Sequence, residues 1–315
     1  MSMENVNVNV IPIDYGKLSV DKEDNTVRYN DLLHKYWTKD TKLNCISVTT
    51  LLHQFSIFDE AFWSAYKTLE IMIGETKFLT IKPALLERKV WNDDHLKTFG
   101  IFPEAFEKER QALLTEWARK RDESCVRGTA IHRARELELL DGGTTVFQHL
   151  GLGGKFTPDT TNLLKAGEKG IYPEILLSRI SDDGKLRLAG QADLVIIDGF
   201  DVYVLDFKTN KKIDLKSYYD RKTKRQSMLK YPMNNIQDSN FWIYSLQLST
   251  YAWMIQKIDP RFNIKMLTLI HYDHEGGCQT YECEYLKNDV ERMLGFYKKQ
   301  LEHDEFKSSR EKVIF

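Results

Sequence analysis

The sequence predicts an α/β protein in which a mixed central sheet is flanked by helices, with a mainly helical N-terminal region before it. Three apolar runs follow one another between turn signals in residues 171–209, which is typical of consecutive antiparallel strands. Segments 106–140 and 238–258 enclose these runs along the chain and have helical spacing. We divide the chain into residues 1–120, which shape substrate access, and residues 121–315, which form the core.

Turn signals and changes of hydrophobic period place the individual elements along the chain. In order, they predict a hairpin over 27–52, a helix from Asp59, an ambiguous stretch over 70–103, a long helix over 106–140, a loop over 144–170, strands over 171–180, 185–197 and 202–209, a basic loop to about Asn235, a helix over 238–258, strands over 266–272 and 279–285, and a helix over 288–303.

Composition excludes several classes of protein. Aromatic residues make up 12% of the chain, which excludes general disorder. The chain contains no run of about 18 uncharged apolar residues, so no membrane span is expected. The N-terminus has no signal-peptide pattern, and the four cysteines have no disulfide-scaffold spacing. We therefore expect a cytoplasmic protein. The net charge is −1, so a nucleic-acid partner would require positive charge gathered locally.

Charged residues fall on one face of the three predicted strands. A four-residue loop over 198–201 places Asp193 opposite Asp206, and Gln191 opposite Lys208. The same counting, with Ile180 facing Lys185, places Glu174 opposite Gln191. Because side chains alternate along a strand, Glu174, Asp193, Asp206 and Lys208 are expected to share that face.

Two directly opposed aspartates repel each other, and a bound divalent cation removes this conflict. Oxygen ligands on a rigid sheet favour Mg²⁺ or Mn²⁺. Lys208, two residues after Asp206, can position a water molecule and stabilise negative charge on a phosphate. The alternative is a solvated strand face with scattered charges.

Two helical pairs add candidates to this group. His132 and Glu136 are four residues apart and point the same way from the helix, as do Gln247 and Tyr251. A neutral imidazole is a common metal ligand. The alternatives are a structural histidine and an ordinary core helix.

Five motifs in order resemble the RecB-like branch of the PD-(D/E)XK nucleases. The motifs are Gly128-Thr129-x-x-His132-x-x-x-Glu136, Pro173-Glu174, Gly190-Gln191-Ala192-Asp193, Asp206-Phe207-Lys208-Thr209 and Gln247-x-x-x-Tyr251. Residues 47–52 and Trp63 also resemble the N-terminal part of phage-encoded members. The resemblance implies a restriction-endonuclease-like core and a metal-dependent DNA exonuclease acting in recombination, repair or phage DNA processing.

The resemblance also implies roles for individual residues. His132, Asp193 and Asp206 would ligate the metal with help from the Phe207 carbonyl, and Lys208 would be catalytic. Glu174 would support the metal shell, whereas Gln247 and Tyr251 would contact the substrate or brace the site. Some relatives hold an iron–sulfur cluster on one early and three late cysteines. Only Cys278 and Cys283 are late here, so we expect no iron–sulfur cluster.

Positive charge is concentrated directly after Lys208. Residues 206–232 contain nine basic and three acidic residues, a net charge of +6, with tyrosines interleaved. Charge combined with aromatic rings suits a DNA backbone with unstacked bases, so single-stranded or frayed DNA ends are the expected partner. The expected contacts are Lys211, Lys212, Lys222, Lys224 and Arg225. A solvated basic loop is the alternative interpretation.

Three functions remain open at this point. The first is the DNA exonuclease, with a single-strand-binding or recombinase protein as a further partner. The second is a non-cleaving DNA-binding subunit used in assembly or recombination, against which the complete Asp193, Asp206 and Lys208 set argues. The third is an RNA-processing nuclease with the same chemistry.

Overall fold

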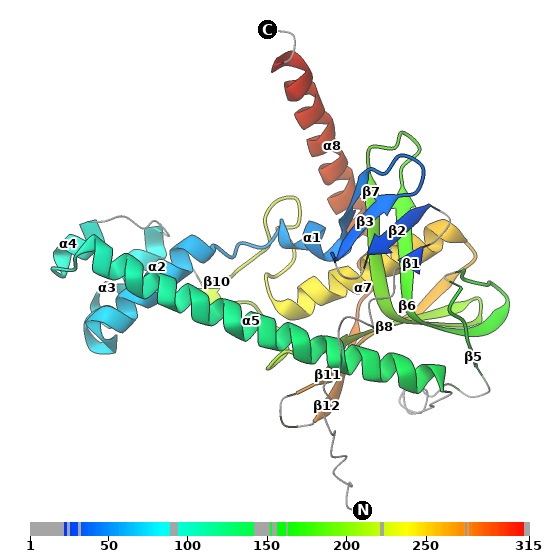
Figure 1. Ribbon diagram of the computed structural model, residues 1–315, viewed down its shortest axis with the longest axis horizontal. Coiled ribbons are helices and arrows are strands. Elements are labelled where there is room, and N and C mark those ends of the chain that lie inside the picture. The colour runs from blue at the N-terminus through cyan, green and yellow to red at the C-terminus, as the bar shows by residue number, and fades with distance from the viewer. Residues whose placement is uncertain are drawn as a thin grey trace, which may run out of the picture.

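The protein has a mixed central sheet flanked by helices, as a computed structural model of the chain shows (Figure 1). The structure describes residues 22–23, 26–30, 33–88, 94–141, 152, 156–161, 163–220, 224–273, 275 and 277–311. Within these residues no helix has the length and apolar character needed to cross a membrane.

Ten strands form the main sheet, and two more form a separate hairpin. The ten are β1 (Lys22–Glu23), β2 (Val27–Asn30), β3 (Lys35–Thr38), β4 (Asn44–Ser47), β5 (Thr157–Pro158), β6 (Glu168–Ile180), β7 (Arg187–Gly199), β8 (Asp201–Lys208), β11 (Asn263–Tyr272) and β12 (Cys278–Cys283). The separate hairpin consists of β9 (Tyr219–Asp220) and β10 (Arg225–Gln226).

Strand β7 is the point where the sheet forks. It pairs along its whole length with β6, so β4 and β8 share its opposite edge. The β8 ladder ends at the pair Leu194 and Leu205, and the parallel β4 ladder is confined to Leu188 and Ala189. Among the described residues, 190–193 have no strand partner on that edge, and this gap holds the polar residues discussed below.

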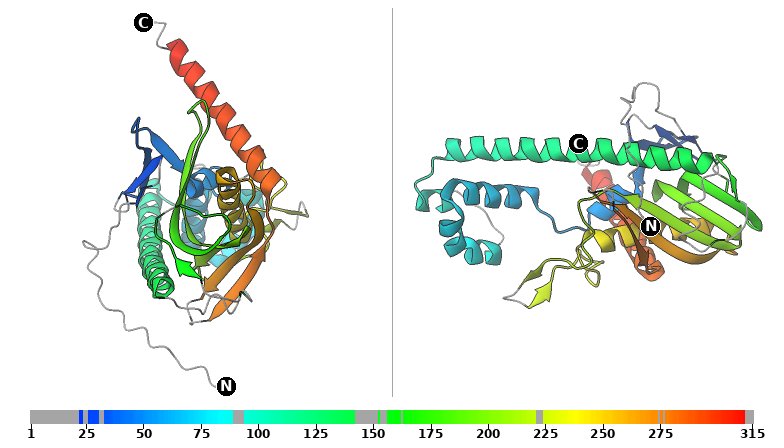
Figure 2. Two further views of the ribbon diagram at one scale, coloured as in Figure 1. Left: turned by 90° about the vertical axis from the view of Figure 1, so that its right-hand side faces the viewer. Right: turned by 90° about the horizontal axis from the view of Figure 1, so that it is seen from below.

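Helices cover both faces of the sheet. Helical residues 60–88 and 94–98, with the start of the long helix that follows them, form an arm beside the sheet (Figure 2). The helices are α1 (Val48–His53), α2 (Glu60–Ile73), α3 (Glu75–Arg88), α4 (Asp94–Thr98), α5 (Pro103–Leu140), α7 (Asn240–Ile258) and α8 (Lys287–Glu311). The arm has its own apolar core, in which Phe62, Leu69 and Phe78 are buried. Helix α5 connects the arm to the sheet without interruption (Figure 1), and the expected division at residue 120 falls inside it.

Two apolar clusters lie on opposite faces of the sheet. Val195 and Val204 belong to the larger cluster with α7 and α8, whereas Leu194 and Leu205 belong to the smaller one, which includes Leu139 of α5. In β7 the larger cluster takes odd-numbered residues at 195 and 197 but even-numbered residues at 188 and 192. The alternation of faces therefore changes at Asp193, beside the fork.

The predicted strand order and the β7–β8 register are confirmed, because Ile197 pairs with Val202 as expected. The expected contact of Gln191 with Lys208 does not form, since β7 and β8 separate before that point. The predicted β6–β7 register is wrong by two residues, and Ile180 pairs with Arg187. Ser181 closes the longer turn responsible, because its backbone N–H donates to the carbonyl of Leu186 at 2.9 Å.

Gly190 permits close packing of Tyr251 of α7 against β7. A Cβ atom at Gly190 would lie 2.7 Å from Tyr251 Cε1 and 3.1 Å from Val48 Cγ2. We expect Gly190→Ala to lower the free energy of unfolding by about 1–3 kcal/mol through overpacking. Urea denaturation measures this change.

Gly295 of α8 provides the matched control for that substitution. A Cβ atom there meets nothing within 4 Å, so Gly295→Ala should raise the free energy of unfolding by about 0.5–1 kcal/mol through helix propensity. Equal effects of the two substitutions would contradict the close packing at Gly190.

Candidate metal and catalytic site

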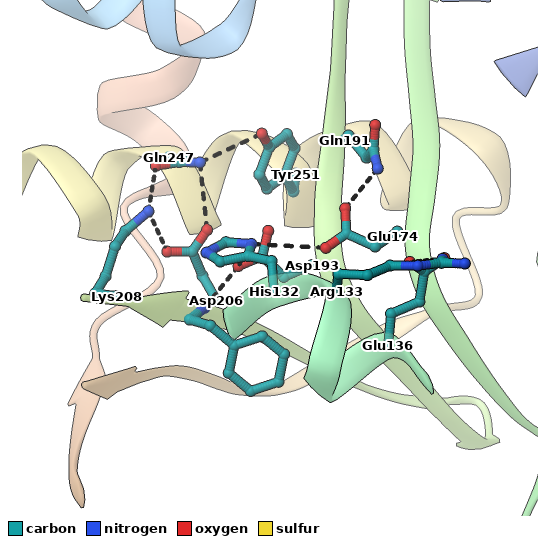
Figure 3. Close-up of polar contacts among 11 residues, drawn as sticks. His132, Arg133, Glu136, Glu174, Gln191, Asp193, Asp206, Lys208, Gln247 and Tyr251 are labelled. Atoms are coloured by element: carbon teal, nitrogen blue, oxygen red, sulfur yellow. Dashed lines mark hydrogen bonds and ion pairs between the residues drawn. The ribbon is translucent and has the colours of Figure 1, made fainter. Parts of the chain in front are cut away.

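Three potential metal ligands converge from three different elements (Figure 3). His132 comes from α5, Glu174 from β6 and Asp193 from β7. His132 Nδ1 lies 3.4 Å from Asp193 Oδ2 and 3.6 Å from Glu174 Oε1. One ligand atom from each residue lies within 4.8 Å of the others, and no other such group of three occurs in the described part of the chain.

An unusual backbone conformation directs Glu174 into this group. Its φ of 48° lies in the left-handed region, although Pro173 and Ile175 on either side keep their pairs with Leu194 and Ala192. This conformation costs about 1–2 kcal/mol for a residue with a side chain. Gln191 Nε2 then donates a hydrogen bond to Glu174 Oε2, which fixes the carboxylate. Such an outlier inside a regular strand is typical of a functional site.

A second polar group lies beside the first, at the end of β8. Lys208 Nζ forms an ion pair of 2.5 Å with Asp206 Oδ2 and donates to Gln247 Oε1 at 3.3 Å. Gln247 Nε2 is 3.3 Å from Asp206 Oδ1 and 3.4 Å from the Tyr251 hydroxyl. The two groups meet at Asp193, whose Oδ2 accepts the backbone N–H of Phe207 at 2.6 Å.

The charges of the first group stabilise one another. Burial disfavours the charged imidazole of His132, but the carboxylates of Asp193 and Glu174 outweigh burial and raise its pKa to about 11. Burial likewise opposes ionisation of Asp193, yet His132 and Lys208 hold its pKa below the usual value. Asp193 is therefore a carboxylate at neutral pH.

For Asp206, in contrast to Asp193, burial outweighs the attraction of the nearby positive charges. Burial raises its pKa to about 6 despite the attraction of Lys208, and the nearby Asp193 carboxylate raises it further. For Lys208, burial favours the neutral amine, but Asp206 and Asp193 raise its pKa above the ordinary value. The ammonium is therefore retained in a buried position among carboxylates.

Of the expected metal ligands, His132 and Asp193 lie in the group of three, together with Glu174. Asp206 Oδ2 pairs with Lys208 Nζ beside this group, and ligation by Asp206 stays a prediction. Phe207 contributes its backbone N–H to Asp193, and its ring packs against His132 with 6.1 Å between centroids. Glu136 pairs with Arg133 and lies away from the group (Figure 3).

Sequence reasoning missed Tyr244 as part of the site. The Lys208 ammonium lies 4.3 Å from the centre of the Tyr244 ring, whose hydroxyl donates to Asn210 Oδ1 at 2.9 Å. Tyr244 precedes Gln247 by three residues, and this helical spacing was a signal that could have found it. Tyr251, in contrast, is 2% exposed and braces Gln247 from inside the core.

The basic residues expected to bind DNA lie outside the polar group. Lys211, Lys212, Lys224 and Arg225 are exposed along the chain that follows Lys208, and Lys212 pairs with Asp214 at 2.7 Å. Lys222 lies outside the described residues.

Comparison with known proteins leaves the family open. No family model and no curated protein matches the chain. Among solved structures, the chain is similar to the crystal structure of SSO0001, with 14% sequence identity and a TM-score of 0.34. The match covers 82% of this chain and 75% of that one.

Proposed function

We propose that the protein is a divalent-metal-dependent nuclease that hydrolyses DNA from an end. The convergence of His132, Glu174 and Asp193 beside the Lys208–Asp206 pair carries this proposal. We further propose a restriction-endonuclease-like core. Its support is the order of a helix, three antiparallel strands, a helix and a strand parallel to β8, with the site where β7 and β8 separate.

The donor set fits a hard divalent cation. One imidazole nitrogen, once its proton is released, and two carboxylates suit Mn²⁺ or Mg²⁺, and the charge of the cation would offset the carboxylates of Glu174 and Asp193. These three residues would hold the cation. When bound, the cation lowers the pKa of a water molecule and offsets negative charge on a phosphate.

The chain's own residues supply the remaining chemistry. The Lys208 ammonium stabilises the negative charge that develops on the phosphate during attack by water. Gln247 and Tyr244 fix the position of that ammonium through a hydrogen bond and a ring contact. His132 from α5 and Gln247 from α7 lie in the same polar cluster (Figure 3), so a phosphate bound there would contact residues carried by both helices.

The requirement for an end separates exonuclease from endonuclease activity. With Mn²⁺, the full-length protein should degrade linear single-stranded DNA stepwise and leave a covalently closed circle of the same sequence intact. The reason is that a strand which reaches the site by threading must have a free end, and a closed circle has none. Gel electrophoresis of end-labelled products measures both rates, and linearising the circle is the control.

Three other outcomes would correct this proposal. Equal rates on circle and line would indicate an endonuclease. Degradation of RNA alone would indicate an RNA-processing enzyme, and binding without cleavage in Mg²⁺ or Mn²⁺ would indicate a non-cleaving DNA-binding subunit.

A further inference from the structure

A short hairpin protrudes from the core on the same side as the helical arm (Figure 2), and two adjacent tyrosines of this segment are exposed. Strands β9 and β10 form this hairpin, and Tyr218 and Tyr219 are 60% and 47% exposed. Tyr218 directly precedes β9, and Tyr219 is the first residue of that strand.

Hydrogen bonds fix the base of this hairpin to the core. The Ser217 N–H donates to Gln237 Oε1 at 3.1 Å, and the Ser217 hydroxyl donates to Gln226 Oε1 at 3.1 Å. The Ser227 N–H donates to the Tyr218 carbonyl at 2.8 Å, and the Asp238 N–H donates to the Ser227 carbonyl at 2.9 Å. An isolated two-stranded hairpin is only marginally stable, so these hydrogen bonds to the core hold the backbone of the two tyrosines in one conformation.

The chain between Lys208 and the hairpin is also anchored. Asn240, the first residue of α7, donates from Nδ2 to the Lys212 carbonyl at 3.0 Å and accepts the Asp214 N–H at 2.7 Å. The chain thus runs from the candidate catalytic lysine to the tyrosines through partly or fully exposed residues, apart from Ser217, which is buried at the base of the hairpin. Exposed basic residues accompany it, namely Lys211, Lys212, Lys216, Lys224 and Arg225.

We propose that Tyr218 and Tyr219 form a stacking platform for the bases of single-stranded DNA, outside the catalytic group. Large exposed rings on an anchored backbone are available for stacking at little cost in ordering, and nearby cations attract the phosphates. Duplex DNA keeps its bases stacked inside the helix, so the platform favours unpaired strands. The choice of DNA rests on the proposed function, whereas the platform itself rests on these contacts.

Binding of a fluorescent 20-nucleotide oligo-dT to the full-length protein in chelator tests the platform without cleavage. Replacing both tyrosines, Tyr218→Ala with Tyr219→Ala, should weaken binding about fivefold or more for each ring that stacks. Replacing both with Phe should keep near-normal affinity, because the rings remain. Phe200→Ala is the matched control, since this 44% exposed ring lies at the opposite end of β8 from Lys208.

Salt dependence separates stacking from charge. Lys224→Gln with Arg225→Gln should reduce the slope of log affinity against log salt by about one to two, because phosphate contacts are lost. The double alanine variant at the tyrosines should keep the slope of the native protein. Affinity for a 20-base-pair duplex should be the same for the native protein and for that variant.

Native affinity of the double alanine variant for oligo-dT, or equal losses on duplex and single strand, would overturn the platform. A clear preference for oligo-U over oligo-dT would overturn the choice of DNA. If the native protein does not cleave DNA with Mn²⁺ but loses oligo-dT binding when both tyrosines are replaced by alanine, the proposed nuclease function is refuted and the stacking platform is supported. If the native protein cleaves DNA but the double alanine variant binds oligo-dT normally, the nuclease function is supported and the platform is refuted.

Discussion

Lys208→Met is expected to reduce DNA cleavage in Mn²⁺ by a factor of about 10²–10³, with Mn²⁺ binding retained. The substitution removes the positive charge that the second polar group offers to a phosphate, since Gln247 and Tyr244 are neutral and Asp206 is acidic. His132, Glu174 and Asp193 remain in place. Single-turnover rates on linear single-stranded DNA measure the loss, and Mn²⁺-dependent thermal stabilisation measures the binding.

The variant should also fold. Lys208 lowers the pKa of Asp206, which is already about 6, so removal of the ammonium raises it further. Asp206 then takes up a proton at neutral pH and is buried uncharged instead of as an isolated anion. The matched control is Lys169→Ala, which breaks an ion pair of 2.8 Å with Asp198 at the far end of the sheet. Cleavage at the native rate by the Lys208 variant would reduce this residue to a structural role.

The sequence predicted the elements that carry the site, because their signals are local. Gly199, with a φ of 68°, forms the tight turn between β7 and β8, so counting back from it gave the correct register as far as Leu194 and Leu205, where the ladder ends one residue before the expected pair of Asp193 and Asp206. The turn before β7 has no comparable constraint on its length. The hydrogen bonds of Ser181 lengthened it by two residues, which preserved the face of each side chain but changed every partner.

Other features could not be predicted, because they depend on distant contacts. The pairing of β4 with β7 joins segments about 140 residues apart, and β4 lies on the same edge of β7 as β8. The left-handed backbone of Glu174 has no signal in a residue type that rarely adopts it. Helix α3 was left ambiguous because Pro83 lies inside it and proline is typical of helix breaks.

The two helical pairs show why spacing alone is insufficient. His132 and Glu136 face the same way from α5, yet only His132 meets Asp193, because Arg133 holds Glu136 in an ion pair along the helix. Gln247 and Tyr251 also share a face, but Tyr251 lies deeper and supports Gln247. Spacing predicts direction, and neighbouring charges and depth then decide which side chain reaches the site.

Asp193→Asn is expected to abolish both cleavage and thermal stabilisation by Mn²⁺. At an Mn²⁺ concentration 100 times its dissociation constant, the native protein should gain about 2.7 kcal/mol, which corresponds to a rise in melting temperature of about 4 °C. The amide oxygen of the variant still accepts the Phe207 N–H, so the strand end keeps its geometry. The asparagine side chain lacks the negative charge that would help Glu174 and His132 to bind a cation.

Asp198→Asn, five residues along the same strand, controls for the substitution itself, because Asp198 pairs only with surface Lys169 in the contacts that the structure describes. Differential scanning fluorimetry with and without Mn²⁺ compares each variant with its own metal-free state. The Lys208 variant loses cleavage and keeps the stabilisation, whereas the Asp193 variant loses both, so the pair of results separates metal binding from charge stabilisation. Full stabilisation of the Asp193 variant by Mn²⁺ would place the cation elsewhere, because the two remaining residues, Glu174 and His132, are too few ligands to hold it with the same affinity.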